Sequence, residues 1–425
     1  MNAFKSLRKD QKEAIGLLQI GTFLEYFDLM LYVHLAVLLN ELFFPKTDPH
    51  TAALLSAFAF CSTYVFRPIG ALLFGYIGDH IGRKSAIIIS TSIMGVSCFF
   101  MSILPTYAEI GIWASIFMIV CRILQSLSAT GEVIGAEVYL SEILKPPASY
   151  QLVSWVAELC TVGSFAALLA ASLVFKCGAN WRALFVLGGM VAVSGAVARR
   201  KLRETPEFIK AQVNKSDESK SARVSKTTSL AYFFIYSGYP LCFYIIYIYF
   251  SDILKHSLNY TPQQIIDRNL FLTFLGTVVG VSIIMMAKKF DPLKILKIRG
   301  VFSAVILFVM PMLPLTDIYY LTTLQILLSI FALGTLPAIP ILFKHFPIHK
   351  RFTYSSMLYS LSRAFMYVVT SFGLVYLTDF FGYYGIWVVM FPVSIGFLWG
   401  VSHFEKLENS KNRNVLENMN FMVTT

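Results

Sequence analysis

Long apolar segments, separated by short polar ones, recur along the whole chain. Each apolar segment is close to the length of about 20 residues at which a helix crosses ~30 Å of hydrocarbon. The pattern predicts about twelve spans, near residues 16–42, 52–77, 85–105, 109–143, 150–175, 182–200, 229–254, 266–287, 297–316, 319–343, 353–379 and 383–403. The sequence therefore predicts an all-α membrane protein that crosses the bilayer many times.

Lysine and arginine residues collect in every second connection between these spans. The basic connections are Lys5 to Lys12, Arg83 with Lys84, Arg199 to Lys226, Lys288 to Arg299, Lys344 to Arg351 and Lys406 to Arg413. Positively charged loops mark the cytoplasmic side of a membrane protein. Both termini are therefore expected in the cytoplasm, which requires an even number of spans and agrees with twelve.

One long polar connection divides the chain into two halves. Its Ser, Lys, Asp and Glu residues are typical of a mobile or amphipathic linker. The predicted parts are a six-helix bundle at 1–200, a cytoplasmic linker at 201–228, a second six-helix bundle at 229–404 and a cytoplasmic tail at 405–425. Two such repeats facing one another place a substrate site between them, near the middle of the bilayer.

Composition supports this class and excludes others. Hydrophobic residues make up 56% of the chain and charged residues only 14%, against roughly 25% charged residues in soluble proteins. The net charge of +11 comes from the loops, so no nucleic-acid partner is expected. The six cysteines have neither metal-ligand nor disulfide-framework spacing. We also find no hydrolase motif, and Gly78 to Ser85 has the wrong spacing for a phosphate-binding loop, so no enzyme is predicted.

The first span carries a polar stripe formed by Gly21, Glu25, Asp28 and Tyr32. A charge at the bilayer centre costs about 2.5–3.5 kcal/mol on insertion scales, which makes such residues functional candidates. Two carboxylates one turn apart repel each other in a low dielectric, and a bound proton relieves that repulsion. The stripe thus favours a proton carrier. The alternative is a static pair that an arginine neutralises.

The fourth span carries a second polar face, with Arg122, Gln125 and Glu132. Arg122 is a candidate counter-charge for Glu25 or Asp28. It is equally a candidate ligand for a substrate carboxylate, or a fixed structural counter-ion.

Aromatic and cationic residues line up at helical spacing in the seventh and eleventh spans. Together with two residues of the first half they form the predicted substrate-binding set of Tyr32, Gln125, Tyr236, Tyr239, Tyr359 and Arg363. Arg363 would bind an anionic group, and the aromatic rings would contact a cation or stack on the substrate. Packing alone is the alternative for the aromatic stripe.

The stretch Phe66 to Ser85 resembles the loop between the second and third helices of major facilitator transporters. Gly75, Asp79, Gly82 and Arg83 match the pattern of that loop. The resemblance implies the major facilitator fold and a conformational latch made of Gly75, Asp79, Gly82, Arg83 and Glu142. We expect Asp79 to meet the N-terminal end of the eleventh helix near Phe352, and Arg83 to pair with Asp79 or Glu142.

The corresponding stretch of the second half, Ala287 to Asp291, keeps the spacing of Gly75 to Asp79 but loses the rest of the turn. We therefore expect the latch on one half only.

Further motifs resemble the metabolite:proton symporters, a group with proline/betaine, α-ketoglutarate, citrate and shikimate carriers. They are Gly21 to Asp28, Phe66 to Gly70, Arg122 to Glu132 and Leu202 to Phe208. The resemblance implies proton coupling at Glu25, Asp28, Arg122 and Glu132. It does not identify the substrate, because Arg363 stands where the family has small or neutral residues.

These observations predict a secondary active transporter that carries a small polar metabolite or osmolyte together with H⁺ by alternating access. A zwitterion of the proline/betaine kind and an organic acid both fit. The alternatives are an uncoupled or antiport organic-anion carrier and a sensor-like paralogue that does not transport. We expect a monomer in a bacterial plasma membrane, with no metal and no cofactor, driven by the proton gradient.

Overall fold

The structure is a computed structural model that describes residues 7–45, 64–177, 180–213 and 224–424. Within these ranges every regular element is a helix. Nine helices of the described part are long and apolar enough to cross a membrane. The predicted all-α membrane fold is confirmed. The count of twelve spans and the cytoplasmic termini stay predictions, because part of the predicted span 52–77 lies outside the described residues.

Nine helices form the first half of the described chain. They are α2 (Lys9–His34), α3 (Ala36–Phe43), α5 (Arg67–His80), α6 (Arg83–Ile103), α7 (Tyr107–Ile110), α8 (Ile112–Ile143), α9 (Ala148–Cys177), α10 (Trp181–Arg199) and α11 (Pro206–Val213).

The second half begins with α13 (Lys226–Phe243), which continues through a π-helical segment (Tyr244–Tyr249) into α14 (Phe250–His256). The later helices are α15 (Pro262–Met286), α16 (Pro292–Val309), α17 (Ile318–Phe331), α18 (Ile339–Lys344), α19 (Ile348–Val368), α20 (Leu374–Phe381) and α21 (Gly385–Thr424). Short 3₁₀ or π segments follow α16 (Met310–Met312), α19 (Val369–Gly373) and α20 (Gly382–Tyr384).

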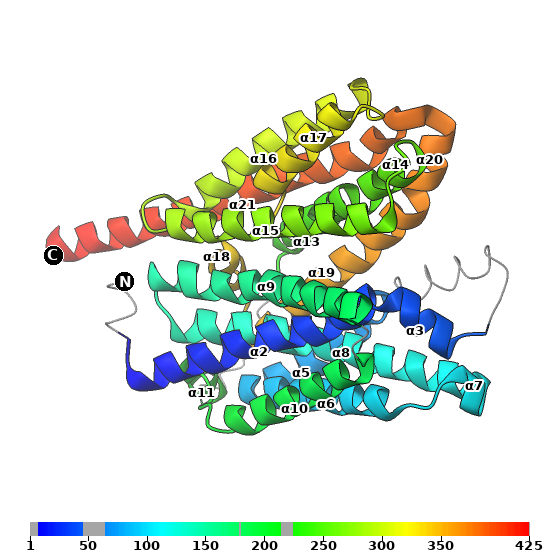
Figure 1. The fold of residues 1–425 in the computed structure, drawn as a ribbon. Helices are drawn as coiled ribbons and strands as arrows, with labels where there is room; N and C mark the ends of the chain where they lie inside the picture. The colour runs from blue at the N-terminus through cyan, green and yellow to red at the C-terminus, as the bar shows by residue number, and fades with distance from the viewer. Residues whose placement is uncertain (1–6, 46–63, 178–179, 214–223, 425) are drawn as a thin grey trace.

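The helices gather in two groups (Figure 1). Those from α2 to α11 form the lower group in the view, and most of those from α13 to α21 form the upper one. The two groups meet where α9 packs against α15, and where α5 packs against α19. A site between the groups is therefore built from both halves of the sequence. The predicted domain boundaries stay a prediction.

Side-chain caps fix where several helices begin. Thr261 and Gln264 form a capping box at the start of α15, and the Asp317 carboxylate accepts a hydrogen bond from the Tyr319 N–H at 2.8 Å at the start of α17. Each cap satisfies backbone N–H groups that have no partner inside the helix, which contributes about 1 kcal/mol. The polar residues at these positions thus end the apolar helices at defined points.

The prediction of one continuous span over 319–343 is wrong. Helix α17 ends at Phe331, and α18 begins only at Ile339. Gly334 and Pro337 lie in between, and proline lacks the N–H group that would continue a helix. Non-helical backbone at membrane depth is tolerated where it borders a cavity. The break between α17 and α18 borders the cavity between the two groups of helices, which is described below.

The polar linker and the tail contain helical structure. Residues 206–213 of the linker form α11, which packs on α8 and α19, whereas residues 214–223 lie outside the described part. The predicted tail at 405–425 is helical as far as Thr424, because α21 continues through it.

Candidate functional site

A cavity of about 200 Å³ lies between the two groups of helices. Sites for drug-sized ligands measure about 300–1,000 Å³, so this cavity suits a small metabolite. Tyr26, Glu137 and Glu158 line it from the first half of the chain, and Tyr236, Arg299 and Arg363 from the second. The cavity therefore presents acids, guanidinium groups and phenols to one small volume.

The break between α17 and α18 forms part of the wall, since residues 332–336 line the cavity. The Nη2 atom of Arg299 donates a hydrogen bond to the Ala332 carbonyl oxygen at 2.7 Å, at the C-terminal end of α17. A cation at this end of a helix satisfies a free carbonyl and complements the helix dipole. Arg299 thus holds the broken helix in place.

Four of the predicted substrate-binding residues come together at this cavity: Tyr236, Tyr239, Tyr359 and Arg363. The Arg363 guanidinium lies over the Tyr359 ring, 4.0 Å from its centroid, and 5.2 Å from the centroid of Tyr239. The hydroxyl groups of Tyr26 and Tyr359 are 3.5 Å apart. The two halves of the chain therefore touch through phenol groups at the cavity wall.

Two buried acids of the cavity were absent from the predicted set. Glu137 is 4% exposed and Glu158 is 3% exposed. Glu137 follows Glu132 by five residues, which turns it by about 140° around the helix, away from the polar face of Arg122 and Glu132. An ionisable residue within an apolar span was the available signal for both acids.

A second polar cluster lies inside the first half. Arg199 forms an ion pair with Glu132 and donates a hydrogen bond to the Thr91 hydroxyl. The Thr91 hydroxyl in turn donates to Glu132 Oε2 at 2.9 Å. Glu25 and Asp28 border the same space of about 10 Å³. Such a volume is about that of one water molecule. We call Glu25, Asp28, Glu132 and Arg199 the acid cluster.

Arg122 belongs to another set of contacts. Its Nη1 atom donates to Gln125 Oε1 at 2.8 Å and to the Leu29 carbonyl oxygen at 3.4 Å. Its guanidinium lies 4.1 Å from the centroid of the Tyr32 ring. Tyr32 and Gln125 thus lie beside Arg122, away from the residues that line the cavity. Among the described residues, Glu132 forms its ion pair with Arg199, whereas Arg122 contacts Gln125, Leu29 and Tyr32.

Two arginines assigned to cytoplasmic loops lie inside helices. Arg199 is the last residue of α10 and has no exposed surface. Arg299 lies seven residues after Pro292 in α16, which is about 10 Å along the helix. The loop assignment of both is wrong. A basic residue near a span boundary looks the same in sequence whether it points to water or to a buried acid.

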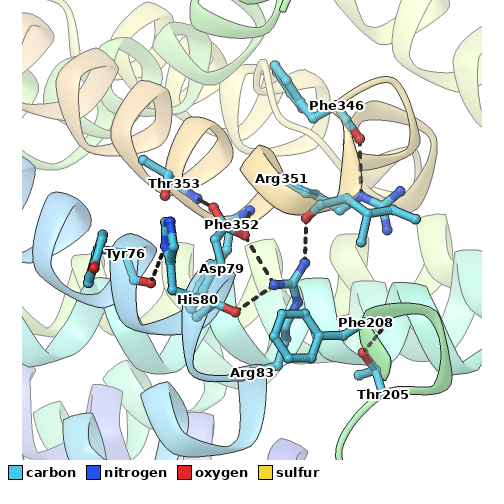
Figure 2. Close-up of polar contacts among 12 residues, drawn as sticks. Tyr76, Asp79, His80, Arg83, Thr205, Phe208, Phe346, Arg351, Phe352 and Thr353 are labelled. Carbon is cyan, nitrogen blue, oxygen red and sulfur yellow. Dashed lines mark hydrogen bonds and ion pairs between the residues drawn. The ribbon is translucent and has the colours of Figure 1, made fainter. Parts of the chain in front are cut away.

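The predicted latch contacts are present at the start of α19 (Figure 2). The Asp79 carboxylate accepts hydrogen bonds from the Phe352 N–H at 3.1 Å and the Thr353 N–H at 2.8 Å. Its Oδ1 atom also pairs with Arg83 Nη1 at 3.1 Å. Asp79 thereby connects α5 to α19 across the two halves.

Arg83 uses all five N–H groups of its guanidinium. Nε and Nη2 donate to Glu142 at 3.3 and 3.1 Å, and Nη2 also donates to the Ile348 carbonyl oxygen at 2.8 Å. Nη1 donates to the Gly78 carbonyl oxygen at 2.5 Å as well as to Asp79. The ends of α5, α8 and α19 therefore meet at one buried cation.

The linker joins this network through residues that follow α10. The Thr205 hydroxyl donates to Glu142 Oε2 at 2.6 Å, and Arg351 pairs with both Glu142 and Glu207. The ring of Phe208 lies 4.8 Å from the Arg83 guanidinium. The segment Thr205 to Phe208 is thus fixed against α8 and α19.

Two glycines of the latch are required by geometry. A Cβ on Gly75 would lie 2.7 Å from the Thr353 Cα atom, which is too close for a side chain, so Gly75 lets α5 approach α19. Gly82 has a φ of 144°, in the region that favours glycine. The role of Gly75, Asp79, Gly82, Arg83 and Glu142 as a latch stays a prediction.

The corresponding acid of the second half makes different contacts. Asp291 caps its own helix, with Oδ1 accepting from the Leu293 and Lys294 N–H groups at 2.9 and 3.1 Å. Asp79 therefore contacts the other half of the described chain, whereas Asp291 caps a helix of its own half. Among those residues no group of His, Cys, Asp and Glu is arranged to hold a metal ion.

The sequence matches the family described as "Sugar (and other) transporter" over residues 17–232. Among similar proteins, the proline/betaine transporter of Escherichia coli (strain K12) is 26% identical over 63% of this chain and 59% of its own length. The citrate-proton symporter of Klebsiella pneumoniae is 33% identical over 44% of each chain. The inner membrane metabolite transport protein YhjE of E. coli (strain K12) is 33% identical over 54% of this chain and 55% of its own.

This chain thus spans 44% to 59% of the length of these relatives. They are bacterial, and with the nine apolar helices of the described part they confirm the predicted location in a bacterial inner membrane.

Solved structures share the fold at low sequence identity. The proton:xylose symporter XylE bound to 6-bromo-6-deoxy-D-glucose has a TM-score of 0.76 and 13% identity, over 93% of this chain and 95% of its own. The human organic anion transporter MFSD10 has a TM-score of 0.70 and 12% identity, over 93% of this chain and 100% of its own. With the family match over half of the sequence, the chain belongs to the sugar (and other) transporter family, within the major facilitator superfamily.

Proposed function

We propose that this protein is a proton-coupled symporter for a small polar metabolite, which works by alternating access between two six-helix halves. The observation that carries the proposal is a buried acid cluster that is separate from a cavity between the two halves. A transporter that couples two fluxes needs a site for each, and both sites must respond to the same conformational change.

The acid cluster supports the proton site. Glu25, Asp28 and Glu132 share one small space with a single lining guanidinium, that of Arg199. A fully ionised cluster would carry excess negative charge in a low dielectric, where an uncompensated charge is costly. A proton that binds there removes this excess. Glu25 and Asp28 are the proposed carriers, and Arg199 joins the predicted set as their neighbouring cation.

The latch supports alternating access. Asp79 and Arg83 bind the first turns of α19 directly, and Glu142 of α8 pairs with Arg351 of α19. These contacts cross between the halves, so they must break when the cavity opens on this side. The proposed cycle therefore alternates between this closed state and one in which α19 has moved away. We further propose that the working unit is a monomer in the bilayer.

Uptake by purified protein in liposomes tests the proposal. The lumen is made alkaline relative to the outside, and labelled zwitterions and carboxylates are offered at two pH values. We expect accumulation that a protonophore abolishes. Accumulation that is equal with and without the protonophore would contradict proton coupling.

A second candidate function is uncoupled or antiport exchange of an organic anion. Two guanidinium groups, those of Arg299 and Arg363, line the cavity and attract carboxylates. Antiport would require a trans anion inside the liposome, uncoupled transport would not, and neither would respond to the protonophore. Binding of ligand without any flux would instead indicate a sensor-like protein.

A further inference from the structure

The charged groups of the cavity are segregated by half. The carboxylates of Glu137 and Glu158 come from α8 and α9, whereas the guanidinium groups of Arg299 and Arg363 come from α16 and α19. No direct ion pair joins these carboxylates to these guanidinium groups in the part of the chain that the structure describes. One wall therefore presents carboxyl groups and the facing wall presents guanidinium groups.

Each of these four side chains has a buried polar atom without a hydrogen-bond partner among the described residues. The acceptors are Glu137 Oε2 and Glu158 Oε1, and the donors are Arg299 Nε and Arg363 Nη1. Buried polar atoms in native proteins are normally paired, because an unpaired one costs about 1–3 kcal/mol. A ligand that brings N–H donors to one wall and carboxylate oxygens to the other would satisfy both sets.

The position of Glu158 is fixed by the opposite half. A Cβ added to Gly280 of α15 would overlap its carboxylate, so the acid lies directly against that helix. Glu158 thus reaches across the interface between α9 and α15 and stays at the cavity wall. Its Oε1 atom has no hydrogen-bond partner among the described residues and is available to a ligand.

Of the aromatic rings that line the cavity, those of Tyr239 and Tyr359 already face a cation of the protein. Quaternary ammonium ligands are recognised on open aromatic faces. Here the Arg363 guanidinium already lies over Tyr359 and beside Tyr239, with its carbon at 4.0 and 5.2 Å from the two ring centroids. The unpaired acceptors Glu137 Oε2 and Glu158 Oε1 are a different kind of partner, because only a cationic nitrogen that carries N–H groups can donate hydrogen bonds to them.

We propose that the cavity binds a small zwitterion whose cationic nitrogen carries at least one N–H group. The nitrogen would lie between Glu137 and Glu158, and the carboxylate would bind Arg299 and Arg363. This selects primary, secondary and tertiary ammonium acids over fully methylated betaines, and over dicarboxylates and neutral sugars. The inference rests on the proposed function, in that the cavity is taken as the substrate site.

A methylation series tests this with the full chain in lipid nanodiscs. L-Proline has two N–H groups on its nitrogen, N-methyl-L-proline has one, and N,N-dimethyl-L-proline has none. Calorimetry measures the Kd of each. We expect a loss of about tenfold or more at the second methylation, the size of a lost hydrogen bond to a charged group. Each methylation adds one methyl group and removes one N–H group, so the comparison of the two steps shows the effect of losing the last N–H group.

Variants locate the effect. Glu137→Gln and Glu158→Gln should each weaken L-proline binding by about tenfold and weaken the dimethyl form less, because that form has a charge attraction but no hydrogen bond to lose. Asp267→Asn, at an exposed acid of α15, is the matched control and should bind all three compounds as the parent protein does. Thermal unfolding shows that each variant is folded.

Equal binding of the three compounds overturns the proposal, as does binding of none of them, or a preference for the dimethyl form or for succinate. The outcomes for the two proposals differ. Selective binding of N–H zwitterions without proton-driven uptake would overturn the symport and leave this inference standing. Proton-driven uptake that is equal for all three compounds would support the symport and overturn the proposed N–H selectivity.

Discussion

The guanidinium group of Arg199 occupies the space that a side chain on Gly21 would fill. Gly21 lies in α2, and Arg199 is the last residue of α10. Because Gly21 has no Cβ, the guanidinium can reach both Glu132 and Thr91. The acid cluster thus depends on one glycine in the polar stripe of the first helix.

Gly21→Ala should therefore displace Arg199 and break its pair with Glu132. Breaking a buried ion pair costs about 3–5 kcal/mol, so we expect a lower thermal unfolding midpoint and the loss of proton-driven uptake. Gly16→Ala is the control on the same helix, since nothing lies within 4 Å of a Cβ there. It should raise stability slightly, by about 1 kcal/mol or less. Equal effects of the two substitutions would contradict this role of Gly21.

Arg199→Met should be more harmful alone than in combination with Glu132→Gln. The single change leaves the Glu132 carboxylate buried without its cation, at a cost of about 3–5 kcal/mol, whereas the double change removes both charges. A double-mutant cycle on thermal unfolding measures this coupling. Strictly additive effects would show that the ion pair does not contribute to stability.

Glu25→Gln and Asp28→Asn should abolish proton-driven accumulation and preserve exchange of labelled substrate between the two sides. A neutral amide fills the same volume and does not carry the proton. Liposome uptake under an imposed pH gradient, compared with counterflow at equal pH, separates the two activities. Full accumulation by both variants would rule out these residues as carriers.

Asp79→Ala should slow transport by about tenfold or more and leave the Kd for the substrate unchanged. It removes two charge-assisted hydrogen bonds to the start of α19, each worth about 1.5–3 kcal/mol. Uptake rate and calorimetric Kd are measured on the same preparation.

Asp291→Ala is the matched control for Asp79, because this carboxylate caps its own helix. It should lower stability by about 1 kcal/mol and leave the transport rate intact. Lost substrate binding in a folded Asp79→Ala protein would count against a latch, as would a slow Asp291→Ala variant.

The sequence by itself determined the class of fold, the approximate positions of most of the described apolar helices and the latch contact. Apolar segments of bilayer length leave the backbone no alternative to helices. Asp79, Gly82 and Arg83 lie next to one another in the chain, so their turn is a local structure. Their meeting with Phe352 was predictable from the family resemblance and from the attraction of a carboxylate to a helix N-terminus.

Only the tertiary structure decided which charges meet inside the membrane. Helical periodicity shows on which face of its helix Glu132 or Glu137 lies. It does not show which other helix packs against that face. Arg199 and Arg299 lie near span boundaries, where a long side chain can turn to water or inward. The partner of Arg199 is Glu132, and that of Arg299 is the Ala332 carbonyl at a broken helix; both partners are distant in sequence. Helix packing brings them together, and a single sequence does not encode that packing in any local pattern.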